Sequence, residues 1–155
     1  MDFAFYTTRQ NHKIFYSFLK GFSPEQLGQI PEGFRNSMFW NIAHVMVTQQ
    51  KLVYGLSGKP LLIGDYWAEA YQKGTAPASS PSVDEIEELK ELLFSTLDQT
   101  EIDYKAGVFT EFKTYMTSAK VELASVEQAI QFNLFHEGLH MGTLLAMQKL
   151  VSTDQ

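Results

Sequence analysis

The sequence predicts an all-α protein: a four-helix bundle whose long helices are joined by long crossover connections. Three observations support this fold class. Apolar residues recur at helical spacing in four long segments. Pairs of residues typical of helix starts precede two of these segments, and two stretches without a helical pattern separate the segments. The 155 residues, 45% of them hydrophobic, are expected to form a single domain, 1–155, around a buried core.

The first two helices are predicted in the N-terminal third of the chain. The first runs from about residue 3 to 20, with one face made of Phe5, Thr8, His12, Phe15, Tyr16 and Leu19. A loop over 22–35, with one turn at 24–27, follows it. The second helix is predicted from residue 36 or 37 to Leu56, where nearby glycines act as stop signals.

The other two helices follow long connections. Residues 59–82 are expected to be a linker with a short helix over 65–72, before a third helix from Ser82 to about Gln99. The stretch 101–124 is interpreted as an irregular crossover, although its alternating pattern also fits an extended chain. The last helix is predicted from Ser125 to about Val151. Ser82 is followed three residues later by Glu85, and Ser125 by Gln128. Each pair predicts a capping box at the start of its helix.

Composition excludes several classes of function. The net charge is −6 and the twelve basic residues are scattered, which argues against binding to nucleic acid. The absence of cysteine excludes disulfides, cysteine-based zinc sites and a thiol nucleophile of the protein itself. No apolar run approaches the roughly 18 residues of a membrane span, and the N-terminus lacks a signal-peptide pattern. A cytoplasmic protein without a membrane partner is expected.

The last predicted helix carries two histidines, His136 and His140, one turn apart. They share a stripe with Ala129, Asn133, Thr143 and Met147, and Leu139 flanks it, so both histidines are expected in the middle of the inward face. Each could be a core histidine satisfied by hydrogen bonds. Because burying two imidazoles without a shared partner costs desolvation twice, a metal ion bound by both is the second interpretation.

The second predicted helix supplies a third histidine, His44, again among apolar neighbours. Three histidines are a typical catalytic zinc set with one coordination position open, but imidazole also suits nickel, iron and copper. Trp40, Asn41 and Thr48 are the candidate pocket residues beside His44. The fourth histidine, His12, is interpreted as structural or pocket-lining and is left out of the ligand set.

Residues 136–140, HEGLH, match the metalloprotease pattern H-E-x-x-H, in which Glu137 would be the general base. Such proteases take a third ligand downstream, and neither His nor Glu follows His140. A protease is therefore disfavoured, and Glu137 is kept only as a weak catalytic candidate.

The pattern W40-x-x-x-H44 followed by H136-x-x-x-H140 resembles the DinB-like (DinB/YfiT) superfamily, as do the segments IPEGFRNSMFWNIAHVMVTQQKLVYGLSG and LFHEGLHMGTLLAMQKL around it. The resemblance is weakest over 59–82 and 101–124. It implies a four-helix bundle, commonly dimeric, that holds zinc or nickel on His44, His136 and His140. Better understood members of that superfamily are metal-dependent transferases or isomerases that use low-molecular-weight thiols such as bacillithiol or mycothiol.

The leading hypothesis is a metal-dependent enzyme for a small-molecule substrate, either a thiol-dependent S-transferase or a hydrolase. A non-catalytic bundle that binds a metal or small ligand and a bundle merely stapled by its metal are the alternatives. A homodimer through the last helix is also expected, because that helix is apolar over most of its circumference and carries the small residues Gly138 and Gly142. Alternatively, the segment 59–82 or the segment 101–124 could cover the apolar surface of this helix within one chain.

Overall fold

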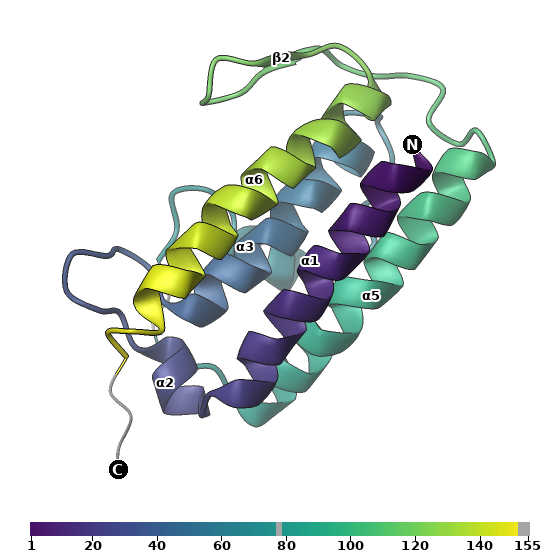
Figure 1. Ribbon diagram of the computed structural model, residues 1–155. Coiled ribbons are helices and arrows are strands. Elements are labelled where there is room, and N and C mark those ends of the chain that lie inside the picture. Colours follow the sequence, from purple (N-terminus) through teal and green to yellow (C-terminus); the bar gives the residue numbers. More distant parts are fainter. Residues whose placement is uncertain (77–78, 152–155) are drawn as a thin grey trace.

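The computed structural model describes residues 1–76 and 79–151. Its four long helices lie side by side (Figure 1): α1 (Asp2–Gly21), α3 (Met38–Gln50), α5 (Val83–Lys105) and α6 (Val126–Met147). Helices α1 and α3 each pack against both α5 and α6, which closes the bundle into a ring. The all-α prediction is confirmed. None of the described helices combines the length and the apolar character that crossing a membrane requires.

Helices α3 and α5 run in the same direction, so the chain between them must return along the bundle (Figure 1). The π-helix η1 (Lys51–Gly55) continues α3, and the return that follows contains the short helix α4 (Asp65–Ala70). Residues 77–78 of the predicted linker lie outside the described residues. The single turn predicted at 24–27 is the helix α2 (Pro24–Gly28).

Serines begin the last two long helices, as predicted. Ser82 accepts a hydrogen bond from the Glu85 backbone, and the Glu85 side chain bonds back to the Ser82 N–H, so the predicted capping box is confirmed. The second box is only half formed: Ser125 Oγ accepts from Gln128 N, but Gln128 Oε1 accepts from Ala124 N instead of Ser125 N.

Helix α5 continues to Lys105, past the end predicted near Gln99. Long-range contacts hold its extra turn. Tyr104 packs against Phe5 at the start of α1, with ring centroids 5.8 Å apart, and the Tyr54 hydroxyl donates to the Asp103 carboxylate.

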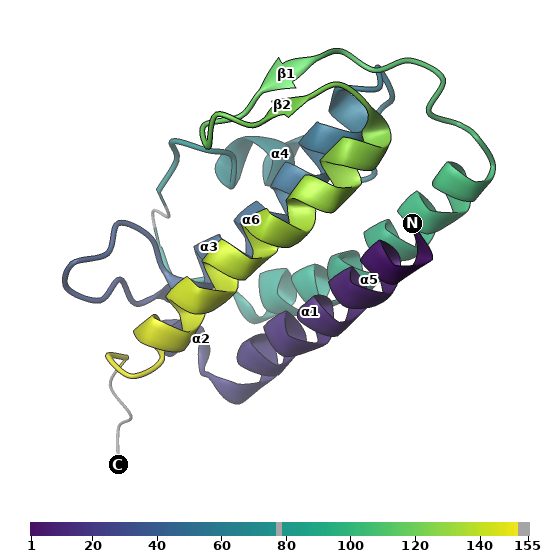
Figure 2. The same ribbon diagram turned by 45° about the horizontal axis from the view of Figure 1, so that its top comes forward.

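The crossover that follows α5 is mostly irregular, as interpreted from the sequence, but it also contains two short strands. Strands β1 (Tyr115–Met116) and β2 (Glu122–Leu123) pair antiparallel and form a hairpin near one end of α3 and α6 (Figure 2). The alternating pattern in this stretch was the correct signal. Leu123 is buried in the core, which fixes the hairpin to the bundle.

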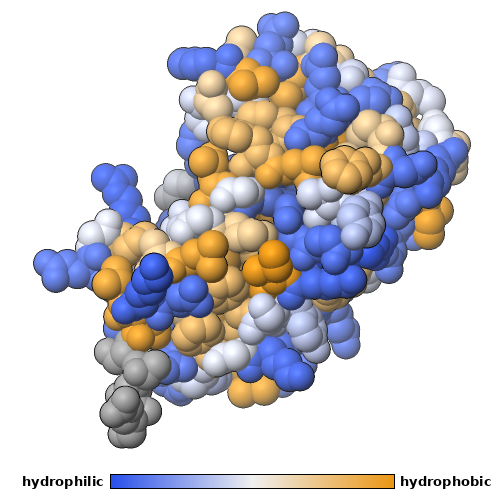
Figure 3. Space-filling view, viewed as in Figure 1, coloured by the Kyte–Doolittle hydropathy of each residue, from blue (hydrophilic) through white to orange (hydrophobic). Residues whose placement is uncertain are grey.

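Helix α6 is turned differently from the prediction. The centre of its buried face is Asn133 and Glu137, whereas Leu139, predicted beside the buried stripe, is 54% exposed. His136 and His140 therefore lie at the edge of the buried face and not in its middle. Hydrophobic side chains are visible along the surface over α6 (Figure 3), and its exposed apolar residues are Phe135, Leu139 and Leu145.

Candidate metal centre

Three histidines from two neighbouring helices meet beside the core. His44 lies on α3, of which every residue except Thr48 is buried, and it faces His136 and His140 on α6. The ring centroid of His44 is 5.2 Å from that of His136 and 5.0 Å from that of His140. One ring nitrogen of each histidine lies within 4.8 Å of the others, so this group could hold a metal ion.

The tautomer of His44 follows from its neighbours. Its Nδ1 lies 2.8 Å from the Tyr71 carbonyl oxygen, which can only accept, so Nδ1 donates the proton and Nε2 carries the free lone pair. The Thr48 hydroxyl lies 3.3 Å from that Nε2. Trp40 stacks on the His44 ring at a centroid distance of 4.5 Å, and its own N–H donates to Thr75. The His44 imidazole is therefore held by Trp40 on one ring face and by the Tyr71 carbonyl at Nδ1.

Asn41 fixes the tautomer of His140 in the same way. The Asn41 amide nitrogen donates to the Ser37 carbonyl at 2.8 Å, which leaves its Oδ1 to accept from His140 Nδ1, also at 2.8 Å. A flipped amide would place two acceptors against each other at Ser37. His140 Nε2 is therefore unprotonated, as a metal ligand must be.

Neither neutral tautomer of His136 satisfies both of its ring nitrogens. Its Nε2 lies 3.2 Å from His140 Nε2, and its Nδ1 is buried without a hydrogen-bond partner within the described chain. A proton on Nε2 could bridge to His140 but leaves the buried Nδ1 bare, and a proton on Nδ1 leaves two lone pairs facing each other. Two nitrogens bound to one tetrahedral zinc ion lie about 3.3 Å apart, since each Zn–N bond is about 2.0–2.1 Å. The geometry fits a shared cation.

The electrostatics also favour neutral ligands. Burial, together with the nearby His140 and His44, lowers the pKa of His136 to about 3. Burial and the nearby His44 lower the pKa of His140 to about 4. The pKa of His44 is lowered chiefly by burial. All three imidazoles are therefore uncharged near neutral pH, which is the form that binds metal.

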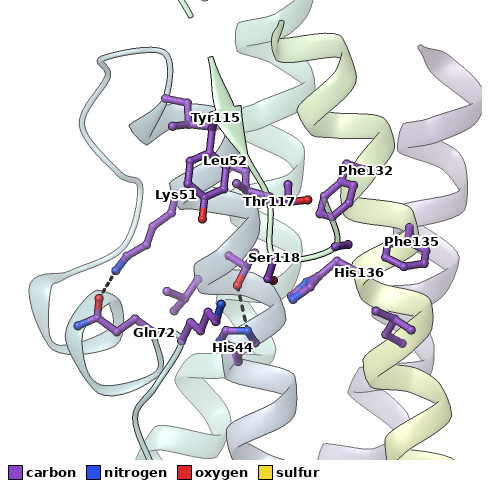
Figure 4. A pocket seen from close by; sticks show the side chains of 16 residues that line it. His44, Lys51, Leu52, Gln72, Tyr115, Thr117, Ser118, Phe132, Phe135 and His136 are labelled. Atoms are coloured by element: carbon purple, nitrogen blue, oxygen red, sulfur yellow. Dashed lines mark hydrogen bonds between the residues drawn. The ribbon is translucent and has the colours of Figure 1, made fainter. Parts of the chain in front are cut away.

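A cavity of about 330 Å³ opens beside His44 and His136 (Figure 4). It lies between α3 with η1, α6, the hairpin and the segment after α4. His44 and His136 form part of its wall together with Val47, Thr48, Lys51, Leu52, Leu56, Gln72, Lys73, Tyr115, Thr117, Ser118, Ala119, Phe132, Phe135 and Leu139. This volume is within the range of small-molecule sites.

The family model of the DinB superfamily matches residues 7–144, most of the chain. The chain belongs to the DinB superfamily. No curated protein matches it. The resemblance first seen in the histidine-bearing segments thus extends over the weaker stretches 59–82 and 101–124, which lie within the matched residues.

The predicted pocket residues of this DinB-superfamily bundle take different places. Thr48 lines the cavity, whereas Trp40 and Asn41 are absent from its described lining. Trp40 covers His44, and Asn41 orients His140. These two residues therefore position the histidines.

Glu137 is not placed for catalysis. Its side chain is 0% exposed and does not line the cavity. Its Oε2 accepts from Asn11 at 2.7 Å, and its Oε1 accepts from Asn133 at 2.8 Å and lies 3.1 Å from His12 Nε2. We call Asn11, His12, Asn133 and Glu137 the α1–α6 polar cluster. This placement away from the cavity argues against the general-base role considered for Glu137, and His12 lies in the same buried cluster, apart from the three histidines.

Several cavity residues were missed by the sequence analysis. Lys51 begins the π-helix, in which Leu56 N donates to the Lys51 carbonyl at 3.1 Å, one residue beyond the α-helical spacing. π-turns inside helices are frequent at functional sites. Gln72 and Lys73 come from the return segment, and Thr117 and Ser118 come from the hairpin. No local pattern marks these four residues, because tertiary packing alone brings them to the cavity.

Proposed function

We propose that this DinB-superfamily protein binds one divalent metal ion on His44, His136 and His140. We propose further that it is an enzyme, and that this ion takes part in a reaction of a small molecule bound in the adjacent cavity. The observation that carries this proposal is the approach of His136 Nε2 to His140 Nε2 at 3.2 Å, in a place where His136 Nδ1 also finds no hydrogen-bond partner among the described residues. Two lone pairs that face each other in a buried site repel, and a cation on the three Nε2 atoms replaces this repulsion with two metal–nitrogen bonds.

The ion would supply Lewis-acid polarisation of a bound thiol, water or carbonyl group. The chain's own residues supply orientation and exclusion of water. Tyr71 and Asn41 hold two imidazoles in the tautomer that directs Nε2 to the centre. Phe132, Phe135 and Leu139 form an apolar wall. A small molecule that packs against this wall would displace water from it.

Zinc and nickel are both compatible with three imidazoles, so the metal is proposed only as divalent. Thiol-dependent S-transfer is the reaction class we favour. Its nucleophile can come from a low-molecular-weight thiol, and the chain itself has no cysteine. Metal-assisted hydrolysis is the second reaction class.

A non-catalytic binding bundle is the alternative function. It is favoured by one observation: no carboxylate is among the described residues that line the cavity, so an acid–base group of that type is missing from the wall.

The test begins with elemental analysis of protein purified without a metal-affinity tag. One ion per chain supports the metal centre, and its absence even after incubation with zinc or nickel would reject it. The loaded protein is then assayed with low-molecular-weight thiols and electrophilic acceptors, and with esters and amides. Turnover that disappears in the His140→Ala variant supports the enzyme, whereas ligand binding without turnover favours the alternative.

The homodimer expected from α6 stays a prediction. We propose that the contact uses the exposed apolar side of this helix, where Phe135 is 51% exposed. Light scattering at micromolar concentration would decide it, and a mass near the 17.6 kDa monomer would reject the dimer without affecting the metal centre.

A further inference from the structure

The wall of the cavity has the opposite charge from the protein as a whole. The chain carries a net charge of −6, yet Lys51 and Lys73 line the cavity, and no aspartate or glutamate joins them among the residues that the structure describes. A positive pocket in an acidic protein concentrates anions from solution.

The charges of the two lysines are not neutralised by neighbours. Lys51 is half-buried, and its Nζ donates to Gln72 Oε1 at 2.7 Å, a neutral acceptor (Figure 4). Lys73 is exposed at the mouth of the cavity. Neither lysine forms an ion pair within residues 1–76 and 79–151. Both act on His44, because their positive charges add to burial in lowering its pKa.

The opposite wall is apolar. Phe132, Phe135 and Leu139 line the cavity from α6, whereas Lys51 lies on η1 and Lys73 in the segment after α4. Leu52 and Leu56 add apolar lining on the side of Lys51. Hydroxyl groups of Thr48, Thr117 and Ser118 complete the lining. One pocket therefore combines a cationic edge, a few hydroxyl groups and a hydrophobic wall.

We propose that the ligand of this site is a small organic anion with an apolar body. Its anionic oxygen atoms would lie between Lys51 and Lys73, next to the three histidines, and its apolar part would lie against the α6 wall. Charge-assisted hydrogen bonds from two ammonium groups recognise carboxylate or phosphate oxygens. The proposal rests on the proposed function in one respect: a divalent ion on the histidines would add further positive charge at the same end of the cavity.

Calorimetric titration with a matched pair of probes tests this inference. 3-Phenylpropanoate carries a carboxylate, and 3-phenylpropanamide has the same shape without the charge. We expect the carboxylate to bind about tenfold more tightly or better, since a hydrogen bond to a charged group contributes roughly this factor. The preference should weaken from low to high salt, because the lysines are partly exposed.

Two variants assign the preference to the lysines. Without metal, the double variant Lys51→Met/Lys73→Met should bind the acid and the amide equally. Lys149→Met, which removes an exposed lysine outside the cavity, should keep the wild-type preference. Lys73→Met alone provides a second variant that disturbs no described hydrogen bond, and it should reduce the preference partially. Circular dichroism confirms that each variant is folded.

The titration is run on metal-loaded and metal-free protein, with metal content measured in each sample. Equal affinity for the acid and the amide, or no binding of the acid at millimolar concentration, overturns the inference whatever the metal content. A preference that survives in the metal-free double variant also overturns it, since groups other than the two lysines would then hold the anion. If the protein binds no metal but still prefers the acid through its lysines, the metal proposal fails and this inference stands.

Discussion

Helix α6 presents two groups of polar side chains to its neighbours. Asn133 and Glu137 face His12 on α1, while His136 and His140 face His44 on α3. Both groups contain buried or largely buried imidazoles, and both connect α6 to a helix far away in the sequence. They differ in whether each histidine ring nitrogen has a hydrogen-bond partner among the described residues.

In the α1–α6 polar cluster, both nitrogens of His12 and both oxygens of Glu137 have partners. His12 Nδ1 donates to the Leu93 carbonyl at 2.5 Å, and Nε2 lies against Glu137. In the three-histidine group, His136 Nδ1 has no partner in the part of the chain that the structure describes, and two Nε2 atoms lie 3.2 Å apart. Burial of a histidine therefore does not by itself indicate a metal site. The arrangement of lone pairs around it does.

The largest expected difference between the two groups is in bound metal. His44→Ala, His136→Ala and His140→Ala should each lower the metal content of tag-free protein by about tenfold or more, because two imidazoles hold an ion far less tightly than three. His12→Ala should keep the wild-type stoichiometry in elemental analysis. Full stoichiometry in His140→Ala, or loss of metal in folded His12→Ala, would break the comparison.

The next largest effect is a loss of stability, and we expect it from changes in the α1–α6 polar cluster. Glu137→Gln places an amide NH₂ among the donors Asn11 and Asn133, so we expect the free energy of unfolding in urea to fall by about 3–5 kcal/mol. Glu91→Gln, at an exposed position of α5, is the matched control and should change it little. A stability loss below about 1 kcal/mol in Glu137→Gln would show that the cluster is not a structural unit.

The metal-free protein should also respond to pH through the three-histidine group. The pKa values of His136 and His140 are lowered from 6.5 to about 3 and about 4, so the unfolded chain binds protons in this range that the folded chain does not. Stability should therefore fall as the pH is lowered below 6.5, by up to about 1.4 kcal/mol per pH unit for each histidine.

Urea titrations of the metal-free protein at several pH values measure this slope. The variant His136→Gln/His140→Gln removes both groups and should show a smaller slope between pH 6.5 and about 4. An unchanged slope in that variant would mean that other groups dominate the acid response.

The smallest expected effect separates the residues that orient each group. Asn41→Ala removes the acceptor of His140 Nδ1 and should weaken metal affinity about 10- to 100-fold while the stoichiometry at saturating metal is kept. Asn133→Ala, in the α1–α6 polar cluster, should lower stability and leave metal affinity nearly unchanged. A competition assay with a chelating dye measures both, and equal losses of affinity in the two variants would contradict the assignment.

Much of the fold could be read from local patterns. Apolar spacing located the four long helices, and Ser82 with Glu85 located the start of α5, because helical periodicity and capping depend on residues that are three or four positions apart. The same reasoning placed His136 and His140 on one side of whatever helix contained them. His44 was joined to them through its apolar context and the family pattern, since no local rule connects two helices separated by so many residues.

Only the tertiary structure decided which way α6 turns. Apolar spacing favoured Leu139 beside the buried stripe, but the Glu137 carboxylate takes the centre of the buried face, where Asn11 on α1 donates to its Oε2 and His12 lies against its Oε1. The Tyr71 carbonyl at His44 and the lysines of the cavity likewise depend on where the return after α3 passes. These contacts join residues far apart in the chain, and the free energy that selects them comes from packing and polar matching between elements, which the pattern within one helix does not contain.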